Sequence, residues 1–176
     1  MRLAISFLLI GFAAIPVFGQ VRKQEMAGIR NYSRVDASVG CGGATDPSAI
    51  GELKKEGYVS IINLRLPTEE GANVEGERAA AQAAGLKYIH LPFNAAMPDS
   101  KVVDSFLAAV ADKSNQPVYI HCASASRVGG MWMIKRVLQD QWPMDKALAE
   151  AQVIGLASAP LTQFATDYIN SHKKQN

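Results

Sequence analysis

The residues best suited to chemistry lie in one short segment, His121-Cys122-Ala123-Ser124-Ala125-Ser126-Arg127. The apolar run at 117–121 has the length and composition of a buried strand, and the small residues after Arg127 favour a helix. A tight turn from strand to helix directs several backbone N–H groups into one concavity, which suits an oxyanion. We expect a cysteine at the base of that concavity to ionise near neutral pH and to act as a nucleophile.

Arg127 completes this arrangement, because a planar guanidinium can hold two oxygens of a phosphate or sulfate group. A thiolate, an oxyanion cradle and a fixed cation together predict nucleophilic transfer from a tetrahedral oxyanion. Cys122 is then the nucleophile, Arg127 the clamp and His121 a support for the loop. The substrate-binding loop consists of Ala123, Ser124, Ala125 and Ser126. The alternative, a buried structural thiol beside a surface arginine, explains a lone cysteine better than it explains this combined pattern.

Two residues outside the loop are further candidates. Arg65 ends another apolar run on the side where the site should lie. It is assigned to substrate binding, and a surface salt bridge to Glu69 or Glu70 is the equal alternative. Cys41 lies in a glycine-rich bend at 40–43 and would either form a reversible disulfide with Cys122 in an oxidising compartment or remain an unpaired buried thiol.

The segments around this loop alternate between strand and helix patterns. Short apolar runs at 59–64, 87–93 and 117–121 predict buried strands. Helical patterns occupy the intervals between them and the C-terminal third of the chain. This alternation predicts an α/β domain with a central, largely parallel sheet flanked by helices. Ligands bind beyond the carboxyl ends of strands in such sheets, which is where the segment 121–127 lies.

The N-terminal residues have the three-part pattern of a secretory signal: a positive start, an apolar run at 3–14 and a small residue at Gly19. The sequence therefore predicts a signal peptide at 1–19, a lead-in at 20–30 and one α/β domain at 31–176. The apolar stretch is shorter than the ~20 residues that span a bilayer, so an uncleaved anchor is the minor alternative. We expect an exported protein, periplasmic or secreted, without stable membrane insertion after signal cleavage.

The composition excludes several classes of protein. Lys and Arg number 18 against 16 Asp and Glu, a net charge of +2, so the chain lacks the basic excess of a nucleic-acid binder. Two cysteines cannot form a disulfide scaffold or a four-cysteine zinc site. No metal or organic cofactor is implied, because the histidines show no metal-ligand spacing: His90, His121 and His172.

The segment 121–130, HCASASRVGG, resembles the active loop of cysteine-dependent phosphatases. It is most similar to the bacterial beta-lactamase hydrolase-like, phosphatase-like domain family, a relative of dual-specificity phosphatases. Supporting motifs lie at 42–47 (GGATDP), 61–65 (IINLR) and 88–92 (YIHLP). The resemblance runs from about residue 31 to residue 156. It implies a dual-specificity-phosphatase-like fold and a phosphoric monoester hydrolase, with a phosphorylated substrate, a phosphocysteine at Cys122 and Arg127 as phosphate clamp.

Three positions depart from the wider phosphatase pattern. The loop between Cys122 and Arg127 is one residue shorter, a length that the bacterial branch tolerates and that rhodaneses, sulfurtransferases with a persulfide on cysteine, also have. Ala125 replaces a frequent glycine, and a positive φ there would strain alanine by ~1 kcal/mol or more. Val128 replaces the usual Ser or Thr. The alternatives are therefore a sulfurtransferase acting on a sulfane-sulfur substrate and an inactive, anion-binding pseudophosphatase.

The general acid is the remaining assignment. Dual-specificity phosphatases have an aspartate after the strand that matches 88–93, whereas this chain has Asn94 and Ala95. Asp99 is the nearest carboxylate downstream and is the candidate acid, with a helix N-cap as its alternative role. Glu69 and Glu70 are the other candidates. Without an acid, only substrates with good leaving groups would turn over well, since general acid catalysis is typically worth ~10²–10⁴-fold.

Overall fold

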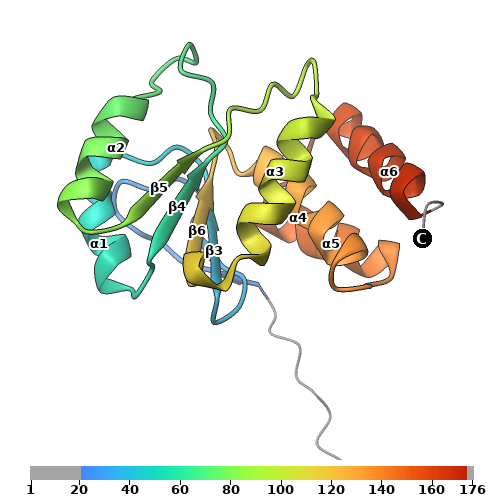
Figure 1. Ribbon diagram of the computed structural model, residues 1–176, viewed down its shortest axis with the longest axis horizontal. Helices are drawn as coiled ribbons and strands as arrows, with labels where there is room; N and C mark the ends of the chain where they lie inside the picture. The colour runs from blue at the N-terminus through green and yellow to red at the C-terminus, as the bar shows by residue number, and fades with distance from the viewer. Residues whose placement is uncertain (1–20, 174–176) are drawn as a thin grey trace, which may run out of the picture.

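Four parallel strands form the centre of the sheet: β3 (Val39–Gly42), β4 (Ser60–Asn63), β5 (Lys87–His90) and β6 (Val118–His121). The computed structural model describes residues 21–173 and shows these strands with helices on both faces (Figure 1). Two short antiparallel strands, β1 (Arg22–Lys23) and β2 (Ser33–Arg34), extend one edge. The strand order is β1-β2-β3-β6-β4-β5, so the predicted, largely parallel sheet is confirmed.

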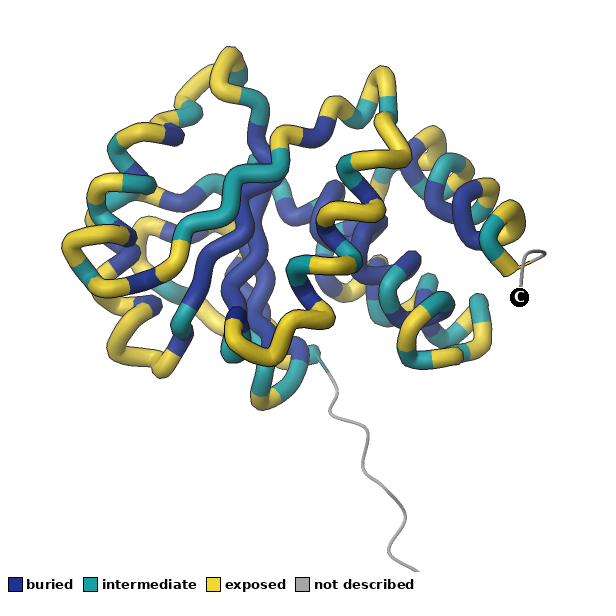
Figure 2. The backbone as a smooth tube through the Cα atoms, in the orientation of Figure 1, coloured by how far each residue is buried: buried dark blue, intermediate teal, exposed yellow. Residues whose placement is uncertain are grey.

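The helices divide between the two faces of the sheet. One face carries α1 (Ile50–Lys55) and α2 (Val74–Ala83), while the other carries α3 (Ser100–Ala111), α4 (Ser126–Leu138), α5 (Met144–Ile154) and α6 (Ala159–Lys173) (Figure 1). Two 3₁₀ turns, Pro47–Ala49 and Lys113–Asn115, join these elements. Each face encloses its own apolar cluster, and the central strands between them are buried (Figure 2).

Residues 40–43, interpreted from the sequence as a bend, belong largely to strand β3, so that interpretation was wrong. Glycine is required here by close packing rather than by a turn. A Cβ at Gly40 would overlap the Tyr58 hydroxyl, and one at Gly42 would overlap the Tyr119 hydroxyl. Bare backbone therefore lets two buried tyrosines approach the strand, and Cys41 between them becomes part of the sheet.

The register of the strands assembles one edge of the sheet. Gly42 and Asn63 both pair with His121, and Asn63 also pairs with His90. The residues that follow these positions therefore emerge together at the carboxyl edge. Cys122 is one of them, so the sheet itself brings the predicted nucleophile beside the loops that follow β3, β4 and β5.

The predicted signal at 1–19 lies outside the described residues. Part of the predicted lead-in has regular structure, since Arg22 and Lys23 pair with β2. Within residues 21–173, no helix combines the length and the apolar character needed to cross a bilayer.

Candidate active site

The loop from β6 to α4 is anchored to its neighbours on both sides. The backbone N–H of Cys122 donates to the Gly42 carbonyl at 3.3 Å, and the Ala123 carbonyl accepts from Ala44 N–H at 2.9 Å. The Asn31 side chain donates to the Ser124 carbonyl at 3.1 Å. Cys122 is only 1% exposed. These contacts hold Cys122, the predicted nucleophile, in a buried position at the start of the loop.

Ala125 adopts the left-handed conformation, with φ 73° and ψ −1°, and caps α4. This is the positive φ at which the sequence predicts strain of ~1 kcal/mol or more for alanine. Gly155 makes room for the alanine methyl, because a Cβ at Gly155 would lie 3.0 Å from the Ala125 Cβ. The loop therefore keeps the left-handed backbone that glycine usually provides, and it requires a glycine, Gly155, on the turn that faces Ala125.

Helix α4 begins with backbone donors available to a ligand. Its first intrahelical bond runs from Gly129 N–H to the Ala125 carbonyl at 3.0 Å. The N–H groups of Ser126, Arg127 and Val128 precede this first helical donor and therefore have no acceptor within the helix. Together with the positive end of the helix dipole, these donors lie where the sequence predicts the anion cradle.

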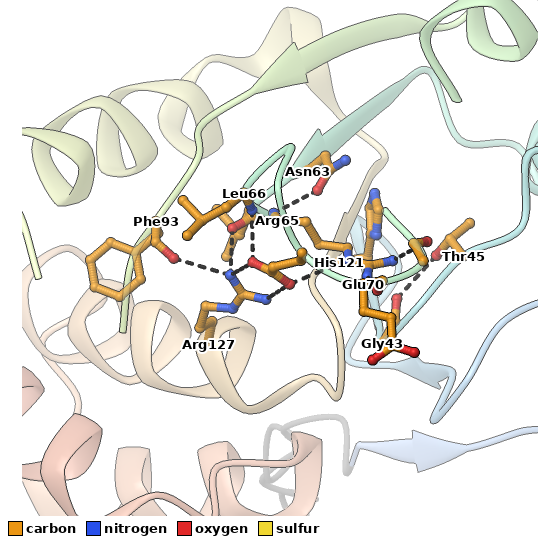
Figure 3. A network of polar contacts seen from close by, with 12 residues as sticks. Gly43, Thr45, Asn63, Arg65, Leu66, Glu70, Phe93, His121 and Arg127 are labelled. Carbon is orange, nitrogen blue, oxygen red and sulfur yellow. Dashed lines mark hydrogen bonds and ion pairs between the residues drawn. The ribbon is translucent and has the colours of Figure 1, made fainter. Parts of the chain in front are cut away.

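Arg127 is held by four hydrogen bonds (Figure 3). Its two terminal nitrogens grip the Glu69 carboxylate at 2.5 and 2.7 Å. One of them also donates to the carbonyls of Leu64 at 3.0 Å and Phe93 at 3.1 Å. Burial opposes the charged guanidinium, but its hydrogen bonds to Glu69 and its electrostatic interaction with Cys122 outweigh burial and raise the pKa of Arg127. The cation is thus fixed, ionised and adjacent to the nucleophile.

The sequence interpretation missed the contact between Glu69 and Arg127. Glu69 comes from the loop after β4, where Leu66 N–H and the Arg65 side chain also donate to its carboxylate at 2.7 and 3.4 Å. Partial burial would raise the pKa of Glu69, but the hydrogen bonds from Arg127 and Leu66 lower it overall. The group stays ionised, so it orients Arg127 and is poorly suited to be the general acid. Its position after a strand at the same sheet edge was the available signal.

Arg65 braces the loop that carries Glu69. Besides its contact with Glu69, the buried guanidinium donates to the carbonyls of Glu70 at 2.6 Å and Gly71 at 2.9 Å. The salt-bridge alternative is therefore present. Arg65 is not one of the described residues that line the pocket beside Arg127. Contact between Arg65 and a substrate therefore stays a prediction.

A pocket of about 570 Å³ opens above the loop. Its wall combines the loop with the turn between α5 and α6 and with the segment after β5. The lining residues are Asn31, Ala95, Ser124, Ser126, Arg127, Gly155, Ala157, Ser158 and Leu161. Ser124 and Ser126 thus border the pocket as predicted from their polarity, and Arg127 is the charged side chain among these described liners.

Asp99 lies at the N-terminus of α3, where its carboxylate accepts from Lys101 N–H at 2.9 Å. This is the capping role that the sequence offered as the alternative to acid catalysis. No carboxylate lines the pocket within the described part of the chain, and Ala95 occupies the wall there. Proton donation by Asp99 stays a prediction.

The two cysteines are both free thiols in this structure. Cys41 is fully buried, which raises its pKa well above the usual range, and it lies in the same apolar cluster as Cys122. This structure therefore has Cys41 as an unpaired buried thiol, the second of the two alternatives. Across residues 21–173, no group of three His, Cys, Asp or Glu side chains is arranged to hold a metal ion.

Residues 32–139 match the family described as beta-lactamase hydrolase-like protein, phosphatase-like domain. The chain belongs to this family. The curated beta-lactamase hydrolase-like protein of Xylella fastidiosa (strain Temecula1) is 33% identical over 110 residues. That match covers 60% of this chain but only 25% of the relative, so the chain spans about a quarter of the relative's length.

Solved structures share the fold. The DUF442 protein of Shewanella putrefaciens CN-32 superposes with a TM-score of 0.72 at 22% identity, covering 84% of this chain and 95% of its own. The catalytic core of the PP-IP phosphatase Siw14 from S. cerevisiae gives 0.68 at 22%, covering 86% and 93%. P. aeruginosa TpbA gives 0.66 at 19%, covering 86% and 89%. The family model thus shows a phosphatase-like domain, and these structures share its fold.

Proposed function

We propose that the protein is a cysteine-dependent phosphatase that hydrolyses phosphoric monoesters. The observation that carries the proposal is the Arg127 guanidinium, which Glu69 and the carbonyls of Leu64 and Phe93 fix in the wall of a pocket, close to Cys122. A guanidinium oriented in this way can bind two phosphate oxygens, while the N–H groups at the start of α4 bind the third.

The reaction proceeds in two displacements. The Cys122 thiolate attacks phosphorus, the S–P bond forms, and the P–O bond to the leaving group breaks as that oxygen takes a proton. Water then attacks phosphorus, the S–P bond breaks, and inorganic phosphate leaves with the thiolate restored. Asp99 is the proposed proton donor. Arg127 and the loop N–H groups hold the phosphoryl oxygens through both steps.

The pocket favours a substrate with one phosphoryl group on a good leaving group. Its described liners include one cation, Arg127, and neutral polar side chains from Asn31, Ser124 and Ser158. A polyphosphorylated ligand such as the one named for Siw14 would need more positive charge. An aryl phosphate, like the phosphotyrosine bound in one TpbA structure, matches a single clamp and needs less help from an acid.

A sulfurtransferase is the second candidate, and the short loop between Cys122 and Arg127 is the observation that favours it. Cys122 would take the outer sulfur of thiosulfate and release sulfite, and the resulting persulfide would pass that sulfur to an acceptor such as cyanide. The shorter loop encloses a smaller ring, which suits one sulfur atom better than a phosphate.

Paired assays separate these functions. We expect hydrolysis of p-nitrophenyl phosphate, no transfer from thiosulfate to cyanide, and complete loss of activity in Cys122→Ser. Transfer from thiosulfate alone would assign the sulfurtransferase. Inactivity in both assays, together with phosphate binding that depends on Arg127, would assign an anion-binding pseudophosphatase.

Export is the second part of the proposal and rests on the signal pattern at 1–19. We expect the processed chain, beginning after Gly19, in the periplasmic or secreted fraction of the expressing cell. Mass spectrometry of the fractionated protein measures this. Full-length protein in the cytoplasmic fraction would contradict it.

A further inference from the structure

A buried carboxylate lies behind the nucleophile, on the opposite side of the sheet from Arg127. Glu77 extends from α2 and is 1% exposed. Three groups converge on its Oε2 atom: Asn63 Nδ2 at 2.8 Å, the Tyr88 hydroxyl at 2.8 Å and His121 Nε2 at 3.1 Å. A carboxylate removed from water is costly unless such partners compensate it. The mechanism described above makes no use of this group.

Two of the partners of Glu77, His121 and Asn63, are the last residues of strands that lead into the site. His121 is the last residue of β6 and directly precedes Cys122. Asn63 is the last residue of β4, and its Oδ1 accepts from Arg65 N–H at 2.7 Å. The loop that starts at Arg65 carries Glu69, which grips Arg127. One carboxylate therefore touches both the strand that holds the nucleophile and the strand that leads to the clamp.

The imidazole of His121 has a restricted environment. It stacks on Tyr119 with ring centroids 5.6 Å apart and an 8° interplanar angle. The Tyr119 hydroxyl in turn bonds Thr45 Oγ1 at 2.8 Å. Arg78 lies over the Tyr88 ring, 5.1 Å from its centroid, and pairs with the exposed Glu75 at 3.4 Å. Glu77 Oε1 and both ring nitrogens of His121 lack a hydrogen-bond partner among the described residues, so His121 Nε2 meets Glu77 Oε2 as a close polar contact and not as an aligned hydrogen bond.

We propose that Glu77 is a positioning residue that acts through His121 and Asn63. Its carboxylate holds the His121 ring in its stacked orientation at the end of β6, and this fixes the backbone of Cys122 before the N–H groups that begin α4. The same carboxylate holds Asn63 against Arg65 N–H and thereby sets the start of the Glu69 loop. The inference rests on the proposed function only in taking Cys122 as the nucleophile. It holds for phosphate or sulfane sulfur as substrate.

The test measures the nucleophile directly. Purified protein reacts with iodoacetamide, and mass spectrometry follows alkylation of Cys122 across a pH series. We expect Glu77→Gln to slow the reaction about tenfold at neutral pH and to match the wild-type rate at high pH, where the thiol ionises unaided. Glu75→Gln is the matched control, since Glu75 lies on the same helix but is exposed. Equal rates for Glu77→Gln and wild type at neutral pH would overturn the inference.

A double-mutant cycle assigns the path of the effect. In a His121→Gln background, Glu77→Gln should cause less than a twofold further loss, because the pair acts as one unit. Full additivity of the two losses would overturn the His121 part of the inference. If Glu77→Gln does not fold, Glu77→Asp gives the same readout, since it retains the charge but withdraws it from His121. If Glu77→Gln slows alkylation of Cys122 but the wild-type protein has no phosphatase activity, the proposed function is wrong and this inference still holds.

Discussion

Helix α4 carries two arginines that are both 9% exposed, Arg127 in its first turn and Arg136 near its end. Their surroundings differ in the number of acidic partners. Arg136 donates to three carboxylates, at distances of 2.6 to 3.4 Å, and its guanidinium lies over two tryptophan rings at 4.8 and 4.4 Å. The carboxylates belong to Asp36, Asp140 and Glu150. Arg127 has one carboxylate, which it shares with Arg65, and it borders a pocket.

The difference between the two regions lies in their balance of charge. Around Arg136, three acidic side chains more than neutralise Arg136 and Lys135. Around Arg127, two guanidiniums share the single carboxylate of Glu69, which leaves positive charge for an anion. A buried arginine with a complete set of acidic partners is a structural cross-link, and we interpret one left short of acidic partners beside a pocket as a candidate binding group.

The largest expected effect on stability comes from removing Arg136, the cation shared by three carboxylates. Arg136→Met leaves three acidic groups without their shared cation, so the free energy of unfolding should fall by about 3–5 kcal/mol. Urea denaturation measures this loss. The kcat/KM of the protein that remains folded should stay close to the wild-type value, and a loss of activity without a loss of stability would reverse the assignment of this arginine.

Arg127→Met should have the converse result. We expect kcat/KM for an aryl phosphate to fall by ~10²–10³-fold, because the donors that bind the developing charge are lost. The free energy of unfolding should fall by only about 1–2 kcal/mol, since Arg65 still neutralises Glu69. Arg127→Lys keeps the charge without the planar fork and should remain well below wild type. A lysine variant with full activity would contradict the bidentate clamp.

Glu69→Gln sharpens the comparison by loosening the clamp without removing the cation. We expect a ~10–100-fold loss of kcat/KM from a misplaced guanidinium. Because the pKa of Glu69 is lowered in the folded state, its charge stabilises the fold above the unfolded-state pKa. That contribution disappears as the pH falls through the folded-state pKa. Partial exposure limits it to about 1 kcal/mol, measured by urea denaturation at neutral and acidic pH.

Asp99→Asn should have the smallest effect. Asparagine is as good an N-cap as aspartate, so the free energy of unfolding should change by less than about 0.5 kcal/mol. With a p-nitrophenyl leaving group, kcat should fall less than about twofold, because such a group departs without protonation. The same variant assayed on an alkyl phosphate examines the acid role, and a large loss confined to that substrate would identify Asp99 as the proton donor.

Much of the site was predictable because its parts are close in sequence. Cys122, the loop and Arg127 lie within one turn between strand and helix, so local spacing alone indicates an anion cradle. The strained Ala125 was predictable for the same reason, since the backbone of a short loop constrains its own φ. Asp99 as a cap also follows from local sequence, because an N-cap bonds the backbone two residues away.

The contacts that complete the site were not predictable in this way. Glu69 and Arg127 are 58 residues apart, and no periodic pattern links them. The bend interpreted at 40–43 likewise became a strand because buried tyrosines from elsewhere pack on its glycines.

The sequence by itself determined the alternating α/β order and the reactive loop, since both depend on residues a few positions apart. Only the tertiary structure decided which carboxylate holds Arg127 and which lies behind His121. The physical reason is the order of the strands: β6 lies between β3 and β4, so the ends of β4 and β6 meet. That pairing brings the Glu69 loop and helix α2 to the nucleophile, and no local preference of the chain specifies it.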